Sequence, residues 1–179
     1  SMLAVMASMS HRAPGGARIC GDVEFALAHG ALLSTPESIH ERQPVVIGER
    51  WMLAVDGRID NRKSLAREFG LDDIDSSRLG DDALFARAWL RWGEDFWQHV
   101  DGEFALAVWD RQARGLRLLR DRVGQRPLYY AQSGKLVAFA SEPEPLLGLD
   151  GISRVCNQDG LAYLVSANFQ PEDRDTTFY

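Results

Sequence analysis

The sequence predicts an α+β fold in which antiparallel strands form two sheets and helices cover them. Short apolar segments separated by hairpin-like turns dominate the second half of the chain, and such segments are typical of antiparallel sheets. The clearest amphipathic segment begins at Asp82 and follows the 3.6-residue period of an α-helix. Helix and strand signals occur in blocks rather than in strict alternation, which disfavours a parallel βαβ sheet.

The N-terminal third is interpreted as one short helix followed by strands. Apolar spacing predicts a helix at 2–10, and the loop 11–16, which contains Pro and Gly, ends it. Alternating or apolar runs predict three strands, at 23–29, 45–47 and 51–55. The last two flank a short turn with a glycine, which indicates a β-hairpin.

The region after this hairpin combines turns with one short helix. The Asp-Gly pair at 56–57 is expected to end the second strand in a turn. Asp60 or Asn61 can cap a short helix that ends before Gly70. The polar and acidic segment 71–80 is expected to be a surface loop.

The strongest helix signal starts at Asp82. Phe85, Trp89 and Trp92 recur at i, i+4 and i+7, and Gly93 ends the pattern. Four strands are then predicted, at 104–109, 116–119, 128–131 and 136–140. Two further short helices are predicted, at 142–149 and 158–167.

Composition limits the classes of function. The net charge of −6 argues against a protein that binds nucleic acid through a basic surface. Local basic residues are interpreted as a solvated strand-turn face, namely Arg111, Arg114, Arg117, Arg120, Arg122 and Arg126. No apolar run approaches the roughly 20 residues that cross a bilayer, so no membrane partner is expected. Cys20 and Cys156 are expected to be free thiols of a cytoplasmic protein.

Six segments, in order, resemble one family. HRAPGG (11–16), DGRIDN (56–61) and the aspartate pair 81–82 precede GEFALAVWD (102–110), RDRVGQRPLYY (120–130) and FASEPEPLL (139–147). Together they resemble the class II glutamine amidotransferase domain at the N-terminus of asparagine synthetases, over nearly the whole chain. The resemblance implies one domain over 1–179 with the four-layer αββα sandwich of N-terminal-nucleophile hydrolases.

The resemblance also implies a chemistry. An N-terminal cysteine attacks the side-chain amide of glutamine, with its own α-amine as base. An Asn side chain and a Gly amide hold the oxyanion, an Arg binds the glutamine carboxylate and an Asp binds its α-amine. Ammonia then passes to an ATP-dependent synthetase domain.

Several of these residues have no counterpart here. No cysteine lies near the start, and the first strand, which would carry it before the 2–10 helix, is expected to be missing; Cys20 is interior and cannot use a free α-amine. Asp56 stands where the oxyanion Asn belongs, and it has no N–H to donate. Ala31 stands where the carboxylate-binding Arg belongs. Losing one oxyanion donor commonly costs about 10²–10³ in rate.

Gly57 and Asp82 alone keep the residue types of the pocket. The resulting vestigial pocket is therefore Ala31, Asp56, Gly57 and Asp82, with no catalytic residue. The four histidines show no metal spacing, so no metal site is expected. Trp89, Trp92 and Trp97 are expected in the core, and the charged turn at 120–122 is expected to be held by its own ion pairs.

Three functions remain open. The first is a degenerate glutaminase-like domain, as in β-lactam synthetases and lasso-peptide cyclases, that acts as a scaffold for a C-terminal synthetase domain using ATP and Mg²⁺. The second is part of a working glutamine-hydrolysing asparagine synthase whose nucleophile strand is missing from the sequence. The third is a stand-alone binding module. An uncovered sheet edge would also favour a homodimer.

Overall fold

A computed structural model describes residues 2–158 and 162, and its centre is a four-stranded antiparallel sheet with the order β3-β4-β5-β6. The strands of this sheet are β3 (Val45–Ile47), β4 (Trp51–Ile59), β5 (Gly102–Asp110) and β6 (Gly115–Arg120). The pairing of β4 with β5 extends from Trp51 opposite Asp110 to Ile59 opposite Gly102. This long pair is the frame that positions the rest of the domain.

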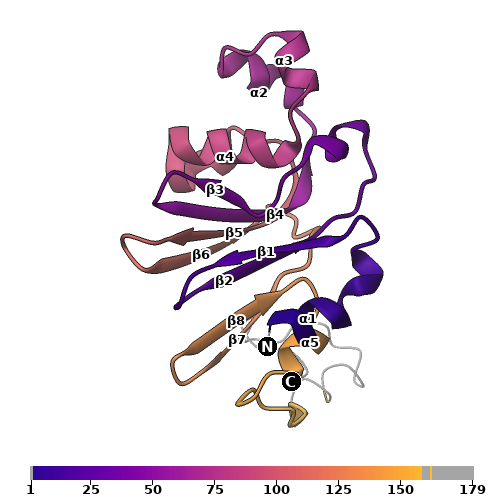
Figure 1. The fold of residues 1–179 in the computed structure, drawn as a ribbon, viewed down its shortest axis with the longest axis vertical. Helices are drawn as coiled ribbons and strands as arrows, with labels where there is room; N and C mark the ends of the chain where they lie inside the picture. Colours follow the sequence, from indigo (N-terminus) through magenta and orange to yellow (C-terminus); the bar gives the residue numbers. More distant parts are fainter. Residues whose placement is uncertain (1, 159–161, 163–179) are drawn as a thin grey trace.

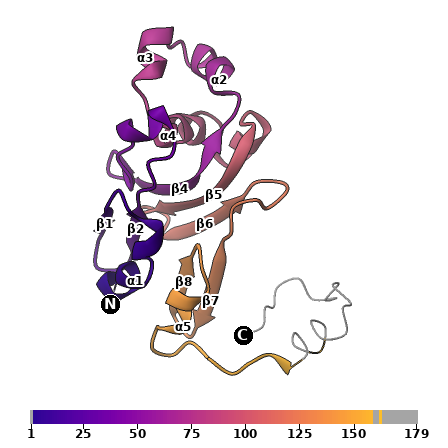
Figure 2. The same ribbon diagram turned by 90° about the vertical axis from the view of Figure 1, so that its right-hand side faces the viewer.

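A second β layer lies on one face of this sheet (Figures 1 and 2). It consists of two hairpins, β1 (Ala17–Gly21) with β2 (Ala26–Gly30) and β7 (Tyr129–Ser133) with β8 (Leu136–Ala140). Among the described residues, no strand pairing joins one hairpin to the other. In the described part of the chain, the second layer thus consists of two separate ribbons.

Helices cover both outer faces (Figure 1). On the central sheet lies α4 (Asp81–Trp92), with α2 (Arg62–Glu68) and α3 (Asp73–Ser77) beyond it; α1 (Met2–Ser8) and α5 (Glu144–Leu147) contact each other and cover the hairpins. Within residues 2–158, three 3₁₀ segments connect these elements: η1 (Ser10–Arg12), η2 (Pro36–His40) and η3 (Gly93–Gln98). The predicted α+β class and four-layer αββα order are confirmed.

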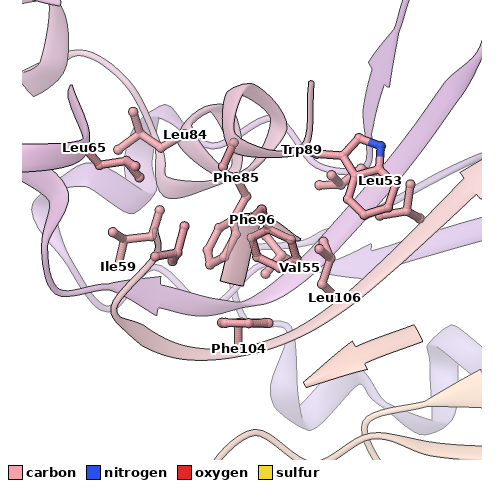
Figure 3. Close-up of a cluster of buried hydrophobic side chains, with 13 residues drawn as sticks. Leu53, Val55, Ile59, Leu65, Leu84, Phe85, Trp89, Phe96, Phe104 and Leu106 are labelled. Atoms are coloured by element: carbon pink, nitrogen blue, oxygen red, sulfur yellow. The ribbon is translucent and has the colours of Figure 1, made fainter. Parts of the chain in front are cut away.

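The main core fills the space between α4 and the central sheet (Figure 3). Phe85 of α4 meets Phe104 of β5 edge to face, with ring centroids 5.5 Å apart, and Phe96 packs 5.2 Å from Phe104. All three rings are at most 2% exposed. Trp89 is also buried, as predicted, so the apolar stripe of the helix is core.

A smaller core lies between the central sheet and the two hairpins. Leu27, Met52, Ala54 and Ala107 are its buried members. The Phe25 ring stacks on Trp109 with centroids 4.5 Å apart. This contact explains how a hairpin without strand pairing to the sheet is nevertheless held against it.

The N-terminal hairpin differs from the prediction. Strand β1 was not predicted, and β2 starts at Ala26 although a strand was expected from residue 23. The Asp22 carboxylate accepts the backbone N–H groups of Glu24 and Phe25, at 2.9 and 3.0 Å. This side-chain turn takes the chain out of the extended conformation.

The predicted turn at 56–57 is wrong, because both residues lie inside β4. Asp56 pairs with Ala105 and Gly57 with Phe104. A Cβ atom on Gly57 would lie 2.6 Å from the Glu103 carbonyl oxygen, so glycine allows the two backbones to approach. The Asp-Gly pair therefore continues the sheet.

Three smaller expectations also changed or were not reached. Segment 71–80 contains α3, which is held by the Arg62 side chain through the carbonyls of Ser76 and Leu79. Trp97 is 40% exposed and is not core. Apart from residues 158 and 162, the helix expected at 158–167 lies outside the described residues. Across 2–158, no helix is long and apolar enough to cross a membrane.

Candidate functional site

The predicted pocket residues come from three elements. Asp56 and Gly57 lie in the middle of β4, Asp82 lies in the first turn of α4, and Ala31 directly follows β2. Of these residues, Asp56 and Asp82 interact electrostatically with His29 of β2. Burial lowers the pKa of His29, while the charges of Asp56 and Asp82 oppose this shift. Asp56 and Asp82 therefore both lie near the same imidazole, which the sequence interpretation had set aside for lack of metal spacing.

Asp56 is held by two arginines from distant parts of the chain. Its Oδ2 accepts from Nη2 of Arg12 at 3.4 Å, and its Oδ1 accepts from Nη1 of Arg126 at 3.2 Å. All three side chains are about one third exposed. The carboxylate at the predicted oxyanion position is thus neutralised by charge-assisted hydrogen bonds.

The turn after β6 places Arg126. The Asp121 carboxylate accepts four backbone N–H groups, from Phe104, Val123, Gln125 and Arg126. Burial opposes ionisation, but these donors hold the pKa of Asp121 below its usual value. The segment 120–130 is conspicuous in the sequence because it builds this turn.

Arg120 completes the turn from the other side. Its guanidinium donates to the carbonyl oxygens of Arg126, at 2.8 Å, and Gly124, at 2.5 Å. Arg122 instead lies over the Trp97 ring, 4.7 Å from its centroid. The expected internal ion pairs of residues 120–122 are therefore wrong: backbone hydrogen bonds and a cation–π contact hold this turn.

Arg12 belongs to a second charged group. Its Nη1 donates to Oε1 of Glu142 at 3.2 Å, and His11 Nε2 lies 3.2 Å from the same oxygen. Burial opposes ionisation of Glu142, but hydrogen bonds with His11 and Arg12 hold its pKa below the usual range. The 11–16 loop is in this way attached to the segment before α5.

Asp82 is engaged by the backbone. It is 3% exposed, and its Oδ2 accepts the N–H of Arg42 at 2.7 Å. The neighbouring Asp81 accepts the N–H of Ile59 at 3.0 Å and pairs with Arg62. Both aspartates connect α4 to other elements. The aspartate at position 82 therefore has a structural role that does not depend on glutamine binding.

Glu41 is a carboxylate near Asp82 that the sequence reasoning missed. Burial, together with the charges of Asp82 and Asp81, raises its pKa to about 7 against the hydrogen bond from Gln43 and the charge of Arg62. The amide of Gln43 also exchanges two hydrogen bonds with the backbone of Val55, at 2.9 and 2.7 Å. No pattern in the sequence indicated that Glu41 lies near Asp82 or that Gln43 contacts Val55.

Ala31 and Cys20 occupy apolar or backbone environments. The carbonyl of Ala31 accepts from the Gly15 N–H at 2.9 Å, and its N–H donates to Gly16 at 2.8 Å. Cys20 lies opposite Leu27 and packs against the smaller core. Burial raises the pKa of the Cys20 thiol, although Arg111 lowers it, so the reactive thiolate is disfavoured. Cys20 forms no disulfide, as predicted.

The remaining arginines of the basic segment are balanced by acidic residues. Arg111 pairs with Asp22 at 3.6 Å, Arg114 with Glu24, and Arg117 with Glu94. With Arg126, four of the six arginines of this face are therefore paired with a carboxylate, whereas Arg120 and Arg122 are held by backbone and aromatic contacts. Over the described part of the chain, no three His, Cys, Asp or Glu side chains are placed to hold a metal ion.

The chain is similar to glutamine amidotransferase domains and to asparagine synthetases. Residues 1–179 match the glutamine amidotransferase domain family. The chain is 27% identical to asparagine synthetase 3 (glutamine-hydrolyzing) of Bacillus subtilis strain 168 over 158 residues, which cover 87% of this chain and 26% of that protein. It is 30% identical to asparagine synthetase B (glutamine-hydrolyzing) of Escherichia coli K12 over 142 residues, covering 78% and 25%. The matched region thus spans about a quarter of each of these relatives.

Proposed function

Because the chain belongs to the glutamine amidotransferase domain family, as the class II domain of asparagine synthetases, we propose that it is a degenerate member that does not hydrolyse glutamine. The carboxylate of Asp56, held between Arg12 and Arg126, is the observation that carries this proposal. At this position the family's reaction needs a neutral amide that donates an N–H to a developing oxyanion. An ionised Asp has no such donor and repels the charge that would form.

Three further features support the proposal. Ala31 offers no cation to the carboxylate of a glutamine, and the Cys20 thiol is disfavoured as a nucleophile by its raised pKa. Asp82 keeps the residue type of the pocket, but its oxygens accept backbone N–H groups of Arg42 and Ala83. Each of these features removes one interaction that glutamine binding or attack requires.

The role that fits such a domain is a scaffold for a synthetase domain. The relatives are asparagine synthetases about four times as long as the region they share with this chain. We therefore propose a C-terminal partner domain that uses ATP and Mg²⁺ to activate a carboxylate for amide formation. The substrate class is a carboxylic acid, and the identity of the acid is left open.

The second candidate is a working glutamine-hydrolysing synthase, which the names of the relatives favour. An assay on the full-length protein separates the two. We expect no glutamate release from glutamine above a no-protein control, with the Escherichia coli enzyme as positive control. Steady release that is lost on Asp82→Ala would overturn the proposal.

The scaffold role has its own test. Deleting residues 1–179 from the full-length protein should abolish or strongly reduce ammonia-supported, ATP-dependent amide formation, or leave the synthetase domain insoluble. Unchanged ammonia-supported activity after deletion would contradict the scaffold role and would leave the absence of glutamine hydrolysis untouched.

A further inference from the structure

The ion pairs of Asp56 have the geometry of a bound carboxylate. Each oxygen faces a different guanidinium, Oδ1 that of Arg126 at 3.2 Å and Oδ2 that of Arg12 at 3.4 Å. Guanidinium groups are well suited to binding carboxylates, because they donate charge-assisted hydrogen bonds in a fixed planar geometry. Here the ligand is a side chain of the same protein.

Both arginines have anchors other than Asp56. Arg12 donates to Glu142 at 3.2 Å. Arg126 donates from Nη2 to Glu103 at 2.5 Å, and its backbone N–H donates to Asp121. Shortening Asp56 would therefore leave the two guanidiniums close to their present positions.

Arg126 also has an unused donor. Its Nε is buried and makes no hydrogen bond with any of the residues that the structure describes. A buried N–H without an acceptor is unfavourable. Asp56, which faces Nη1, does not satisfy this donor.

We propose that Arg12 and Arg126 form a pre-organised carboxylate-binding site, which Asp56 occupies from within the chain and which accepts a small monocarboxylate when Asp56 is shortened. The site is independent of the proposed function, because it requires neither glutamine binding nor its absence. It explains how a charged residue is tolerated in the middle of β4. It also explains why Arg126 lies beside Asp56.

The test is chemical rescue of Asp56→Ala in the full-length protein. Its thermal unfolding is compared in sodium acetate and in sodium chloride at equal ionic strength and neutral pH. We expect the Tm of the variant to be lower than that of the wild type in chloride and to rise by about 2–4 °C in acetate well above its Kd. The wild type should show no such rise, because its site is filled.

Two controls separate a site from a general salt effect. Asp60→Ala removes the carboxylate of the exposed Arg58–Asp60 pair, 2.9 Å apart, and should gain nothing from acetate. Asp56→Ala combined with Arg126→Gln should lose the acetate effect. Equal Tm values in both salts for folded Asp56→Ala would overturn the proposal.

The proposal can still be tested if Asp56→Ala does not fold in chloride. In that case Asp56→Ala and Asp56→Ser are refolded from urea in each salt. Recovery of native circular dichroism in acetate alone supports the site. Failure of both variants in both salts counts against pre-organised guanidiniums and overturns the proposal.

Discussion

The guanidinium of Arg126 lies 3.2 Å from Oδ1 of Asp56, although 70 residues separate the two in the chain. The turn built by Asp121 places the arginine, and the strand pairing of β4 with β5 places the aspartate. Each residue has a second partner, Arg12 for Asp56 and Glu103 for Arg126, so the pair is part of a larger charged network.

This relationship predicts an energetic coupling. Asp56→Asn and Arg126→Met should each destabilise the domain, and the double variant should lose less than the sum of the two. For side chains about one third exposed, the coupling should be about 0.5–1 kcal/mol, because solvent screens the pair. Urea unfolding of the four proteins of the cycle measures it. The same cycle on the exposed Arg58 and Asp60 is the matched control and should give a smaller coupling; equal values would contradict a special role for Arg126.

Glu41 predicts a pH dependence of stability. The folded-state pKa of Glu41, about 7, lies above its ordinary value of 4.5, so the folded state binds one more proton than the unfolded state between these pH values. Protonation of Glu41 stabilises the folded state fully below pH 4.5, and this stabilisation is lost as pH rises through 7. Glu41→Gln should therefore raise the Tm relative to the wild type at pH 8 and have little effect at pH 5.

Thermal unfolding at pH 5, 6, 7 and 8 checks this expectation. Glu49→Gln, in the exposed turn between β3 and β4, is the control for loss of one negative charge. A Tm difference between Glu41→Gln and the wild type that does not change with pH would show that Glu41 keeps an ordinary pKa. The charges facing Glu41, namely Asp81, Asp82 and Arg62, are unchanged in all three proteins.

The close contacts of Gly57 predict that a larger residue at this position would disturb the packing of β4 against β5. A methyl group there would lie 2.6 Å from the Glu103 carbonyl oxygen and 2.7 Å from Phe104 Cβ. Gly57→Ala should force β4 and β5 apart and destabilise the domain by about 1–3 kcal/mol, measured by urea unfolding. Gly115→Ala is the control, since the nearest atom to its added methyl is a flexible arginine nitrogen at 3.4 Å. Equal stability of both variants would mean that Gly57 is not required for strand packing.

Much of the fold was predictable because it rests on local periodicity. The stripe of Phe85, Trp89 and Trp92 correctly predicted α4, and the apolar runs from residue 104 onward correctly predicted β5 to β8. Turn chemistry was less reliable. The Asp-Gly pair at 56–57 has the composition of a turn, yet the long pairing with β5 keeps it extended. Strand β1 escaped notice because most of its residues are exposed and show no apolar alternation.

The candidate site was predictable only as a set of residue types. The absence of an amide at position 56 and of an arginine at position 31 could be seen in the sequence. What Asp56 does instead could not, because Arg12 and Arg126 are 44 and 70 residues away and are positioned by separate turns. Glu41 escaped for the same reason, since its raised pKa depends on burial beside Asp82.

By itself, then, the sequence determined the α+β class, most of the helices and strands and the family resemblance, because these follow from patterns within short stretches of chain. Only the tertiary structure decided which charges neutralise one another and that Asp82 is occupied by backbone N–H groups. The physical reason is that ion pairing and desolvation depend on distances through space, and the folding of the long β4–β5 pair sets those distances.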